Sequence, residues 1–263
     1  MVRSRVLQLQ KGGNFRELGG YQTTDGKTVK WHKIIRSGTL GSLTDHDVDF
    51  LDNYGLKYDV DFRSPAERTQ EPDRIPSETK YLFMPVFSTD ETQNSKQTDR
   101  LQRKMETDPT TGRQQMHHVY QDIITNPHSQ KAYRQFFDVL LENDANDSTL
   151  LFHCTAGKDR TGMGAVYFLS ALGVNEDTVK ADYLLTNKVT KPKLENLVKT
   201  LKLKQASSAF IQSMRDLQSV QISFFNTAMD QIQKTSGTMD AYLHDYLKLS
   251  TTDIHDLRQI YLE

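Results

Sequence analysis

The single cysteine of this 263-residue chain lies in the string HCTAGKDRTG, six positions before an arginine. A cysteine thiolate is a strong nucleophile, and the planar fork of an arginine can hold two oxygens of a phosphoryl group. The residues between Cys154 and Arg160 are small or polar, which suits a tight loop whose backbone N–H groups converge on an anion at a helix N-terminus. The spacing predicts a phosphate-binding loop in which Cys154 attacks phosphorus and Arg160 stabilises the developing charge.

Other residues of this loop have predicted roles in the same chemistry. The helix N-terminus and Arg160 favour the thiolate form of Cys154 over the thiol. The hydroxyl of Thr161 could donate a hydrogen bond to the sulfur, which would ease its departure when water attacks the phosphocysteine. We expect His153 to fix the loop through hydrogen bonds. The residues predicted to bind the phosphate are Thr155, Ala156, Gly157, Lys158 and Thr161.

Two features of the loop have a second interpretation. A free cysteine is commonly a small buried apolar residue, but the loop around Cys154 favours a nucleophile. Lys158 and Asp159 could form an ion pair on the outer face of the loop, or they could contact the substrate. Both interpretations of this pair stay open at the level of the sequence.

The predicted loop needs a strand before it and a helix after it. Residues 149–154, TLLFHC, are nearly all apolar, as in a strand that is buried on both faces. Residues 161–173 have the pattern of a buried helix that ends at a glycine. Alternating apolar and polar residues at 56–62 predict another strand, and 79–87 predict a third. We therefore expect an α/β fold with a central, mostly parallel sheet flanked by helices.

The rest of the chain is predicted to be mainly helical. A helix should begin at Ser64, which can cap it, with Glu67 reaching back to the cap. Residues 88–115 contain few apolar side chains, so we expect an exposed loop or lid there. One domain is expected over 1–263, with a helical extension at 190–263. A helix at 43–55 has Thr44 as its predicted N-cap. Further helices are predicted at 115–125, 129–142 and 175–187, and in KLENLVKTLKLK, FIQSMRDLQSVQISFFNTAMDQIQK, MDAYLHDYLKL and DIHDLRQIYLE.

The composition excludes several classes of protein. The 33 basic and 34 acidic residues nearly cancel, so no general attraction to nucleic acid is expected. No apolar run is long enough to cross a membrane, and the first residues lack the apolar core of a signal peptide. One cysteine allows no intrachain disulfide and no cysteine-based metal cluster. We expect a soluble, cytoplasmic protein that is not inserted in a membrane, with export by a route without a cleavable signal left open.

The cysteine string and four other strings together carry a family resemblance. Cys154, five intervening residues, Arg160, Thr161 and Gly162 resemble the phosphate loop of cysteine-dependent protein tyrosine phosphatases. The wider set resembles the bacterial tyrosine phosphatase family that includes secreted mycobacterial and listerial enzymes. This resemblance spans about 14–187, while the following residues match only in being helical. The other four strings are NFRELGGY at 14–21, IIRSG at 34–38, DFRSPAE at 61–67 and ADYLLTN at 181–187.

The resemblance implies a reaction, a fold and a range of substrates. It implies a tyrosine-phosphatase-like fold and a two-step phosphomonoester hydrolysis that uses no metal and no cofactor, with Cys154 as nucleophile and Arg160 as phosphate binder. The substrate is then a phosphotyrosine protein. In this family the pair at Lys158 and Asp159 accompanies activity on phosphoinositides as well as phosphotyrosine. The resemblance therefore implies a wider substrate range, which could also include phosphoserine and phosphothreonine. The mycobacterial enzyme has helices that form a lid, which implies a mobile cover after residue 190.

The resemblance leaves the general acid open. Related phosphatases use an aspartate on the loop that follows the strand equivalent to 79–87, and that position aligns with Ser88 here. Asp90 lies two residues further on and is the preferred prediction. The alternatives are Asp159, if the phosphate loop supplies its own carboxylate, and Asp61 at the end of a strand.

Several other charged residues have simpler predicted roles. Arg16 and Arg63 are expected to form ion pairs of the scaffold. His117 and His118 are adjacent, lack the i, i+4 spacing of a helical zinc site, and are expected to be ordinary surface residues. The lysines and leucines of 191–204 could bind a membrane or an inositol lipid, but a solvated amphipathic helix is the preferred interpretation.

Two other functions are compatible with the loop. An inositol-phosphate phosphatase would need a wider and more basic pocket than Lys158 alone provides. A non-hydrolysing phosphopeptide-binding module could keep Arg160 and the N–H cradle, but binding alone requires neither Cys154 nor Thr161. A thiol-relay arsenate reductase is excluded because it needs further cysteines.

Overall fold

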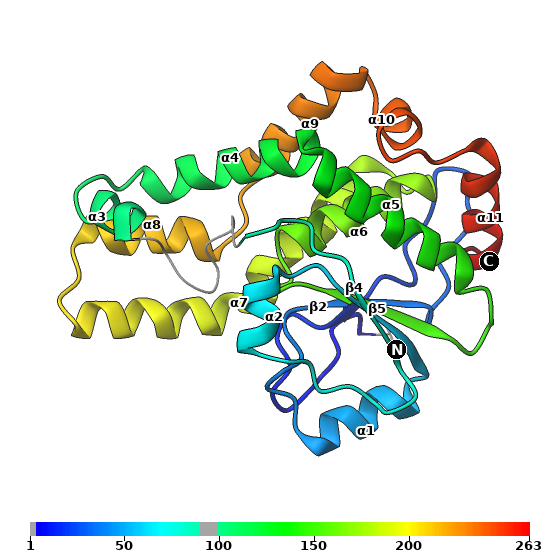
Figure 1. Cartoon of the computed structure of the whole chain (residues 1–263), viewed down its shortest axis with the longest axis horizontal. Helices are drawn as coiled ribbons and strands as arrows, with labels where there is room; N and C mark the ends of the chain where they lie inside the picture. The colour runs from blue at the N-terminus through cyan, green and yellow to red at the C-terminus, as the bar shows by residue number, and fades with distance from the viewer. Residues whose placement is uncertain (1–3, 90–98) are drawn as a thin grey trace.

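A computed structural model describes residues 4–89 and 99–263, which form a five-stranded sheet surrounded by helices (Figure 1). The strand order is β1-β2-β5-β3-β4, and every neighbouring pair is parallel except β1 with β2. The α/β fold with a mostly parallel central sheet is confirmed. The strands are β1 (Arg16–Glu17), β2 (Ile34–Ser37), β3 (Leu56–Asp61), β4 (Lys80–Phe83) and β5 (Thr149–His153).

The central strand, β5, is buried along its whole length. Leu150 and Phe152 belong to the larger hydrophobic cluster on one face of the sheet, and Leu151 belongs to the smaller cluster on the other. This explains the continuous apolar run, because a strand covered on both faces has no side exposed to water. Cys154 therefore follows the middle strand, at the edge of the sheet where the parallel strands end.

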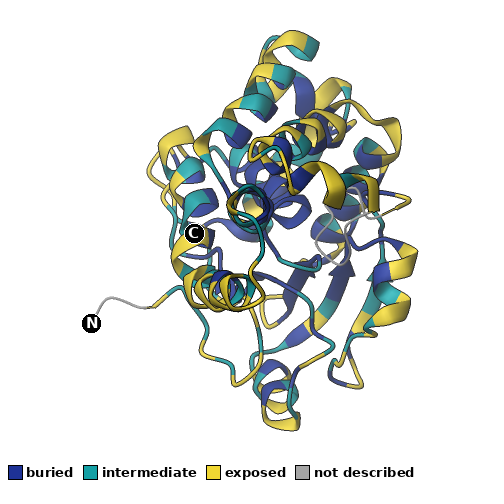
Figure 2. Ribbon diagram, turned by 90° about the vertical axis from the view of Figure 1, so that its left-hand side faces the viewer, coloured by how far each residue is buried: buried dark blue, intermediate teal, exposed yellow. Residues whose placement is uncertain are grey.

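Helices cover both faces of the sheet. α1 covers the smaller cluster, while α3 and the helices after it share the larger cluster with the sheet, and their outer faces carry the exposed residues (Figure 2). No helix in the described ranges is long and apolar enough to cross a membrane. The helices are α1 (Asp45–Asn53), α2 (Pro65–Gln70), α3 (Asp99–Met105), α4 (Thr111–Thr125), α5 (Pro127–Glu142), α6 (Arg160–Ala171), α7 (Glu176–Leu203), α8 (Ser208–Gln218), α9 (Ile222–Ser236), α10 (Met239–Asp245) and α11 (Thr251–Tyr261).

The predicted helix ends agree with the structure where a side-chain cap defines them. Thr44 and Asp47 form a capping box at the start of α1, and Ser64 and Glu67 form another at the start of α2. Gly173 has φ +83° just beyond α6, a conformation that glycine adopts at little cost. These local signals fix the helices that flank the phosphate loop.

The prediction of an exposed loop at 88–115 is wrong for its second part. α3 and the start of α4 lie there, and Met105 is fully buried. Gly112 packs directly on the backbone of Ser213 in α8, where an added Cβ would lie 2.2 Å from an oxygen. A segment poor in apolar residues can be helical when a neighbouring helix covers it, so composition alone misled the prediction. Residues 90–98 of this predicted loop lie outside the described residues.

Three predicted boundaries also differ from the structure. The helices expected at 175–187 and after 190 form one helix, α7, which continues through Pro192. The long helix expected around FIQSMRDLQSVQISFFNTAMDQIQK is broken between α8 and α9, because the Asn187 side chain bonds both backbone groups of Val220. The strand predicted at 79–87 is only four residues long, although the N–H groups of Met84 and Val86 still donate to the carbonyls of Asp61 and Phe62.

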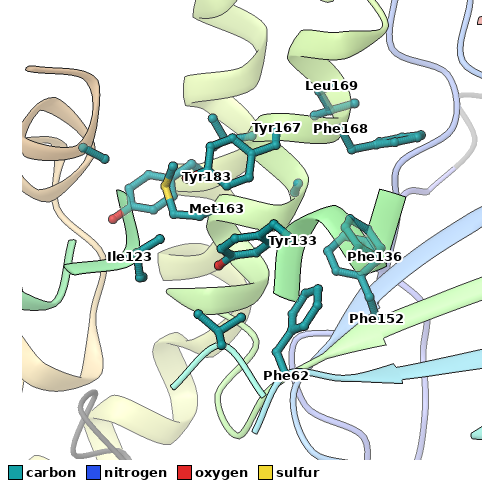
Figure 3. Packing of buried hydrophobic residues seen from close by; sticks show 14 of the residues in the cluster. Phe62, Ile123, Tyr133, Phe136, Phe152, Met163, Tyr167, Phe168, Leu169 and Tyr183 are labelled. Atoms are coloured by element: carbon teal, nitrogen blue, oxygen red, sulfur yellow. The ribbon is translucent and has the colours of Figure 1, made fainter. Parts of the chain in front are cut away.

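Aromatic side chains pack beneath the phosphate loop (Figure 3). The ring of Phe62 contacts those of Tyr133, Phe136 and Phe152 edge-on, with centroids 5.3 to 6.0 Å apart. Gly164 in α6 lets this helix approach, since a Cβ there would lie 3.2 to 3.3 Å from two of the rings. The hydroxyl of Tyr133 donates to the carbonyl of Arg160 at 2.8 Å, so the packed core holds the first residue of α6 directly.

Candidate active site

The predicted catalytic residues lie at the junction of β5 and α6. Cys154 is the first residue after β5, and Arg160 is the first residue of α6. The intervening turn makes the compact loop that the sequence predicts. Both side chains are fully buried, as is that of Thr161.

The carbonyl groups of the loop are held by the surrounding scaffold. The carbonyl of Thr155 accepts from the backbone N–H of Thr39 at 3.1 Å. The Asn14 side chain donates to the carbonyls of Ala156 and Gly157 at 3.2 and 2.8 Å. Because a planar peptide points its C=O and N–H in opposite directions, the N–H groups that follow these carbonyls face away from the scaffold. This is the orientation that an anion-binding loop requires.

Gly157 allows the tightest part of the loop. Its φ is +67°, and a Cβ at this position would lie 2.3 Å from the carbonyl oxygen of Ser37. The carbonyl of Gly157 also accepts from Arg36 at 2.9 Å. Glycine is required here both by the backbone conformation and by the close approach of β2.

Arg160 is oriented by a carboxylate from α2. Its two terminal nitrogens donate to the two oxygens of Glu67 at 2.7 and 2.8 Å, and the Thr155 hydroxyl donates to the same carboxylate. Burial acts to raise the pKa of Glu67, but Arg160 outweighs it and lowers that pKa to about 2. The sequence assigned Glu67 only to a helix cap. Its second role depends on a contact 93 positions away, which no local pattern encodes.

A second carboxylate, Asp182 of α7, anchors the loop from the other side. It pairs with Arg16 at 3.2 Å and with Arg36 at 2.7 Å, and Arg36 in turn holds Gly157. Burial acts to raise the pKa of Asp182, but these two arginines lower it to about 2. The predicted scaffold role of Arg16 is confirmed. The strings that carry the family resemblance thus supply the supports of the loop.

Lys158 and Asp159 do form an ion pair, at 2.6 Å, but the prediction that it lies on the outer face of the loop is wrong. Both residues are buried. The second oxygen of Asp159 accepts from the hydroxyl of Tyr120 at 2.9 Å, and that hydroxyl accepts from Tyr183 at 2.7 Å. The pair is therefore fixed inside the protein by α4 and α7.

His153 lies in a buried cluster of carboxylates directly below Cys154. Its Nε2 is 3.4 Å from Asp59 and 3.3 Å from Asp73. Burial acts to lower the pKa of His153, but the carboxylates raise it to about 10, while burial raises the pKa of Asp59 to about 7. Asp61 pairs with Arg63 at 2.8 Å, which confirms the scaffold role predicted for Arg63. His153 also approaches the carbonyl of Cys154 at 3.4 Å, so it contacts the loop as expected.

The remaining candidates are distributed as follows. Thr161 has no hydrogen-bond partner for its hydroxyl among the described residues, so its bond to the sulfur stays a prediction. Asp90 lies outside the described residues. His118 is exposed, whereas His117 is half-buried and bonds Thr227 at 2.7 Å.

A pocket of about 270 Å³ lies between the phosphate loop and helices α7 and α8. Lys193 is exposed at its edge, while Leu194 and Leu197 are half-buried. The lysines of 191–204 are exposed, the arrangement that a solvated amphipathic helix predicts. The residues that line the pocket are Ala156, Lys158, Thr190, Lys193, Leu194, Leu197, Met214 and Gln218.

A buried cysteine after the central strand, a loop whose carbonyls are held by the scaffold and an arginine that opens the next helix are the features of a cysteine-dependent phosphatase. A model of the tyrosine phosphatase family matches residues 7–263, and the chain belongs to this family. The match continues to the last residue, so the resemblance drawn from the sequence, which ended near 187, was too short.

Individual relatives agree with this assignment. A Cupriavidus necator protein named as a tyrosine-protein phosphatase is 32% identical over 251 residues, which cover 95% of this chain and 85% of the relative. A tyrosine-protein phosphatase of Nostoc commune is 31% identical over 153 residues, which cover 58% of this chain and 48% of the relative. The triple specificity protein phosphatase PtpB of Mycobacterium tuberculosis is 23% identical over 283 residues, which cover 98% and 99%.

Proposed function

We propose that this enzyme hydrolyses phosphotyrosine in proteins through a phosphocysteine at Cys154. The thiolate attacks phosphorus and the ester oxygen leaves with a proton from a general acid. Water then cleaves the S–P bond to release inorganic phosphate and regenerate Cys154. Arg160 and the loop amides stabilise the charge on the transferred group, and Thr161 donates to the departing sulfur. One observation carries this proposal. The scaffold holds the loop carbonyls beside a buried cysteine, so that the N–H groups that follow them face away from the scaffold.

For the general acid, Asp90 remains our first candidate. The backbone N–H of Val86 donates to the carbonyl of Phe62, and the N–H of Phe62 donates to the carbonyl of His153. The segment that leads toward Asp90 therefore runs beside the edge of the sheet at which Cys154 lies. Asp159 is the alternative, although both of its oxygens already accept hydrogen bonds. Asp61 is unsuitable, because burial acts to raise its pKa but His153 and Arg63 lower it to about 2, which keeps it ionised near neutral pH.

Leaving groups of different basicity distinguish Asp90 from Asp159. General-acid help is worth about 10²–10⁴-fold and matters most for a poor leaving group. The Asp90→Asn enzyme should therefore turn over phenyl phosphate much more slowly than the wild type, with a smaller loss on an activated nitrophenyl ester. If Asp159→Asn has this selective defect and Asp90→Asn does not, the acid is Asp159.

Wider substrate specificity is the finer part of the proposal. The M. tuberculosis relative is named for triple specificity, and Lys158 lines the pocket beside the loop. We therefore expect weaker activity on phosphoserine, phosphothreonine and phosphoinositides. The helices α7 and α8, which form one wall of this pocket, are proposed as its cover. A cytoplasmic location also stays a prediction, which cell fractionation tests.

The experiment that tests the function is phosphate release from a panel of substrates with EDTA present throughout. The panel contains a phosphotyrosine peptide, a phosphoserine peptide and mono-phosphorylated phosphoinositides, each with wild type and Cys154→Ser. Release in EDTA that is abolished by Cys154→Ser supports the thiolate mechanism, and the ranking of rates identifies the substrate class. Phosphopeptide binding without turnover between pH 5 and 8 would instead identify a binding module.

A further inference from the structure

The buried cluster below Cys154 has three donor groups that converge from separate parts of the chain. Asp59 comes from β3, Asp73 from the segment after α2, and His153 from β5. One donor atom from each, a carboxylate oxygen or an imidazole nitrogen, lies within 4.8 Å of the other two. Asp59 and Asp73 lie outside the phosphate loop, and His153 precedes Cys154 at the end of β5, so the cluster adjoins the loop without forming part of its anion cradle.

Two of the three donors, Asp59 and His153, lack the hydrogen bonds that buried polar atoms normally make. Asp73, in contrast, accepts from Arg63 and from the backbone N–H of Leu40. Both oxygens of Asp59 and the Nε2 of His153 are buried without a well-directed partner among residues 4–89 and 99–263. The Asp59 side chain has no exposed area. A buried carboxylate without hydrogen bonds is costly, so such a group in a folded protein calls for an explanation. The Nε2 atom is near one oxygen each of Asp59, Asp61 and Asp73, at 3.3 to 3.7 Å, but is aligned with none of them.

The spacing of the donors fits a small divalent cation. Zn²⁺ binds imidazole nitrogen and carboxylate oxygen at about 2.0–2.2 Å in a tetrahedron, which separates neighbouring donors by roughly 3.3–3.6 Å. The distances from Nε2 of His153 to Asp59 and Asp73 are 3.4 and 3.3 Å. We propose that Asp59, Asp73 and His153 form a binding site for a divalent cation of the zinc class, separate from the phosphate site.

The charges that face the site also favour a dication. Three carboxylates, Asp59, Asp61 and Asp73, meet one guanidinium, that of Arg63. Asp61 is already bound by Arg63 and by the Tyr81 hydroxyl, which leaves it outside the donor set. Without an ion, the carboxylates favour the protonated form of His153, whose pKa they raise to about 10. A dication displaces that proton and, with a neutral imidazole, balances the two remaining negative charges, and such compensation is what buried charges require.

The surroundings supply the outer contacts and the access that a metal site needs. The other ring nitrogen of His153, Nδ1, lies 3.4 Å from the carbonyl of Cys154, and a ligating histidine usually donates its second N–H to such a group. Arg63 donates to Asp73. A pocket of about 400 Å³ reaches Asp73 from the surface, and its lining residues are Arg68, Thr69, Pro72, Asp73, Ile75 and Tyr81. Asp73 is therefore the proposed ligand that lies nearest the surface.

The test uses the Cys154→Ser chain, in which no thiolate can bind metal. After treatment with chelator, the protein is titrated with Co²⁺ while its visible absorption is recorded, and with Zn²⁺ by calorimetry. We expect one equivalent of either ion to bind, a tetrahedral Co²⁺ spectrum, and a higher Tm with Zn²⁺. Adding Asp59→Asn or Asp73→Asn should weaken binding by roughly tenfold or more. The matched control is Asp245→Asn, which alters the exposed His244–Asp245 pair and should leave binding unchanged.

Three results would overturn the site. They are no stoichiometric binding by the Cys154→Ser chain, binding that survives both Asp59→Asn and Asp73→Asn, and binding that is lost in the Asp245→Asn control. Asp73 borders the pocket, so Asp73→Asn serves as the second variant if Asp59→Asn does not fold. The circular dichroism of each variant is compared first with that of the Cys154→Ser chain. The outcome is independent of catalysis, because the parent chain has no nucleophile.

Discussion

Glu67 and Arg160 form a two-point ion pair, with nitrogen–oxygen distances of 2.7 and 2.8 Å, between α2 and the start of α6. The same carboxylate accepts from the backbone N–H of Ser64 at 2.8 Å and so completes the capping box of α2. One residue therefore caps a helix and sets the direction of the guanidinium that is to meet the phosphate. Any movement of α2 is transmitted to Arg160 through this pair.

Replacing Glu67 by glutamine should impair catalysis more than folding. The amide keeps the size of the side chain but can accept only one of the two Arg160 bonds, so the guanidinium loses its fixed plane. We expect kcat/KM for a phosphotyrosine peptide to fall on the order of 10- to 100-fold, the effect of a misplaced catalytic group. Steady-state kinetics measures this, with exposed Glu78→Gln as control. Unchanged kcat/KM in Glu67→Gln would mean that Arg160 does not need this partner.

Gly157→Ala should disrupt the phosphate loop. The residue has φ +67°, and the new methyl group would lie 2.3 Å from the Ser37 carbonyl, on backbone that cannot easily move. We expect loss of phosphate release and a decrease in stability of about 3 kcal/mol or more. Gly237→Ala is the matched control, because φ is +81° but nothing lies within 4 Å of the added atom.

Comparing the two glycine variants separates the cost of a positive φ from the cost of the steric clash with Ser37. Gly237→Ala carries only the backbone cost, roughly 1–2 kcal/mol, and should keep full activity. Urea unfolding and phosphatase assays on both variants test the comparison. An equal loss of stability in both variants would show that the backbone around Ser37 shifts and removes the clash.

Asp182 should make stability depend on acid pH. Its pKa is about 2 in the folded protein against an ordinary value of 3.8, so its contribution is complete above pH 4 and is lost as pH falls toward 2. The contribution is about 2 kcal/mol by linkage. Asp182→Asn removes it, so the gap in unfolding free energy between wild type and variant should be widest near pH 6 and narrow toward pH 2.

Urea unfolding at several pH values measures this gap. Asp49→Asn, an exposed position on α1, serves as the control and should follow the wild type at every pH. A gap for Asp182→Asn that is constant between pH 6 and pH 2 would contradict the assignment of the acid-sensitive charge to this residue. The three residues Asp182, Arg16 and Arg36 then would not form the paired cluster in solution.

Local signals in the sequence predicted much of the fold. The capping residues at Thr44 and Ser64, the apolar run of β5 and the glycine after α6 each act within a few positions of where they stand. Helix α3 was missed because its stability comes from packing on α8, and composition cannot reveal a neighbour. The break between α8 and α9 depends on Asn187, more than thirty positions earlier in the chain.

The residues of the candidate site also fall into two groups, those with a local signal in the sequence and those that depend on distant contacts. Cys154 and Arg160 could be predicted as candidates because their spacing is itself the signal, as one short loop holds both. The supports of that loop come from far along the chain, so Asn14 and Asp182 appear only as parts of family strings, and Glu67 was predicted only as part of a helix cap. The buried position of the Lys158–Asp159 pair could not be predicted either. Tyr120, which donates to Asp159, lies on α4, and the sequence does not show that α4 packs beside the loop.

The helices after residue 190 are predicted to move when the phosphate site is filled. Cys154 has no exposed area, and α7 and α8 wall the pocket beside the loop, so we expect part of this wall to move when substrate enters. Vanadate, an oxyanion that the loop should bind, is expected to change the rate of tryptic cleavage within 190–235. Cleavage at exposed Lys131 on α5 gives an internal control that should stay constant. Cleavage within 190–235 that is the same with and without vanadate would argue that α7 and α8 are a fixed wall, with entry from another side.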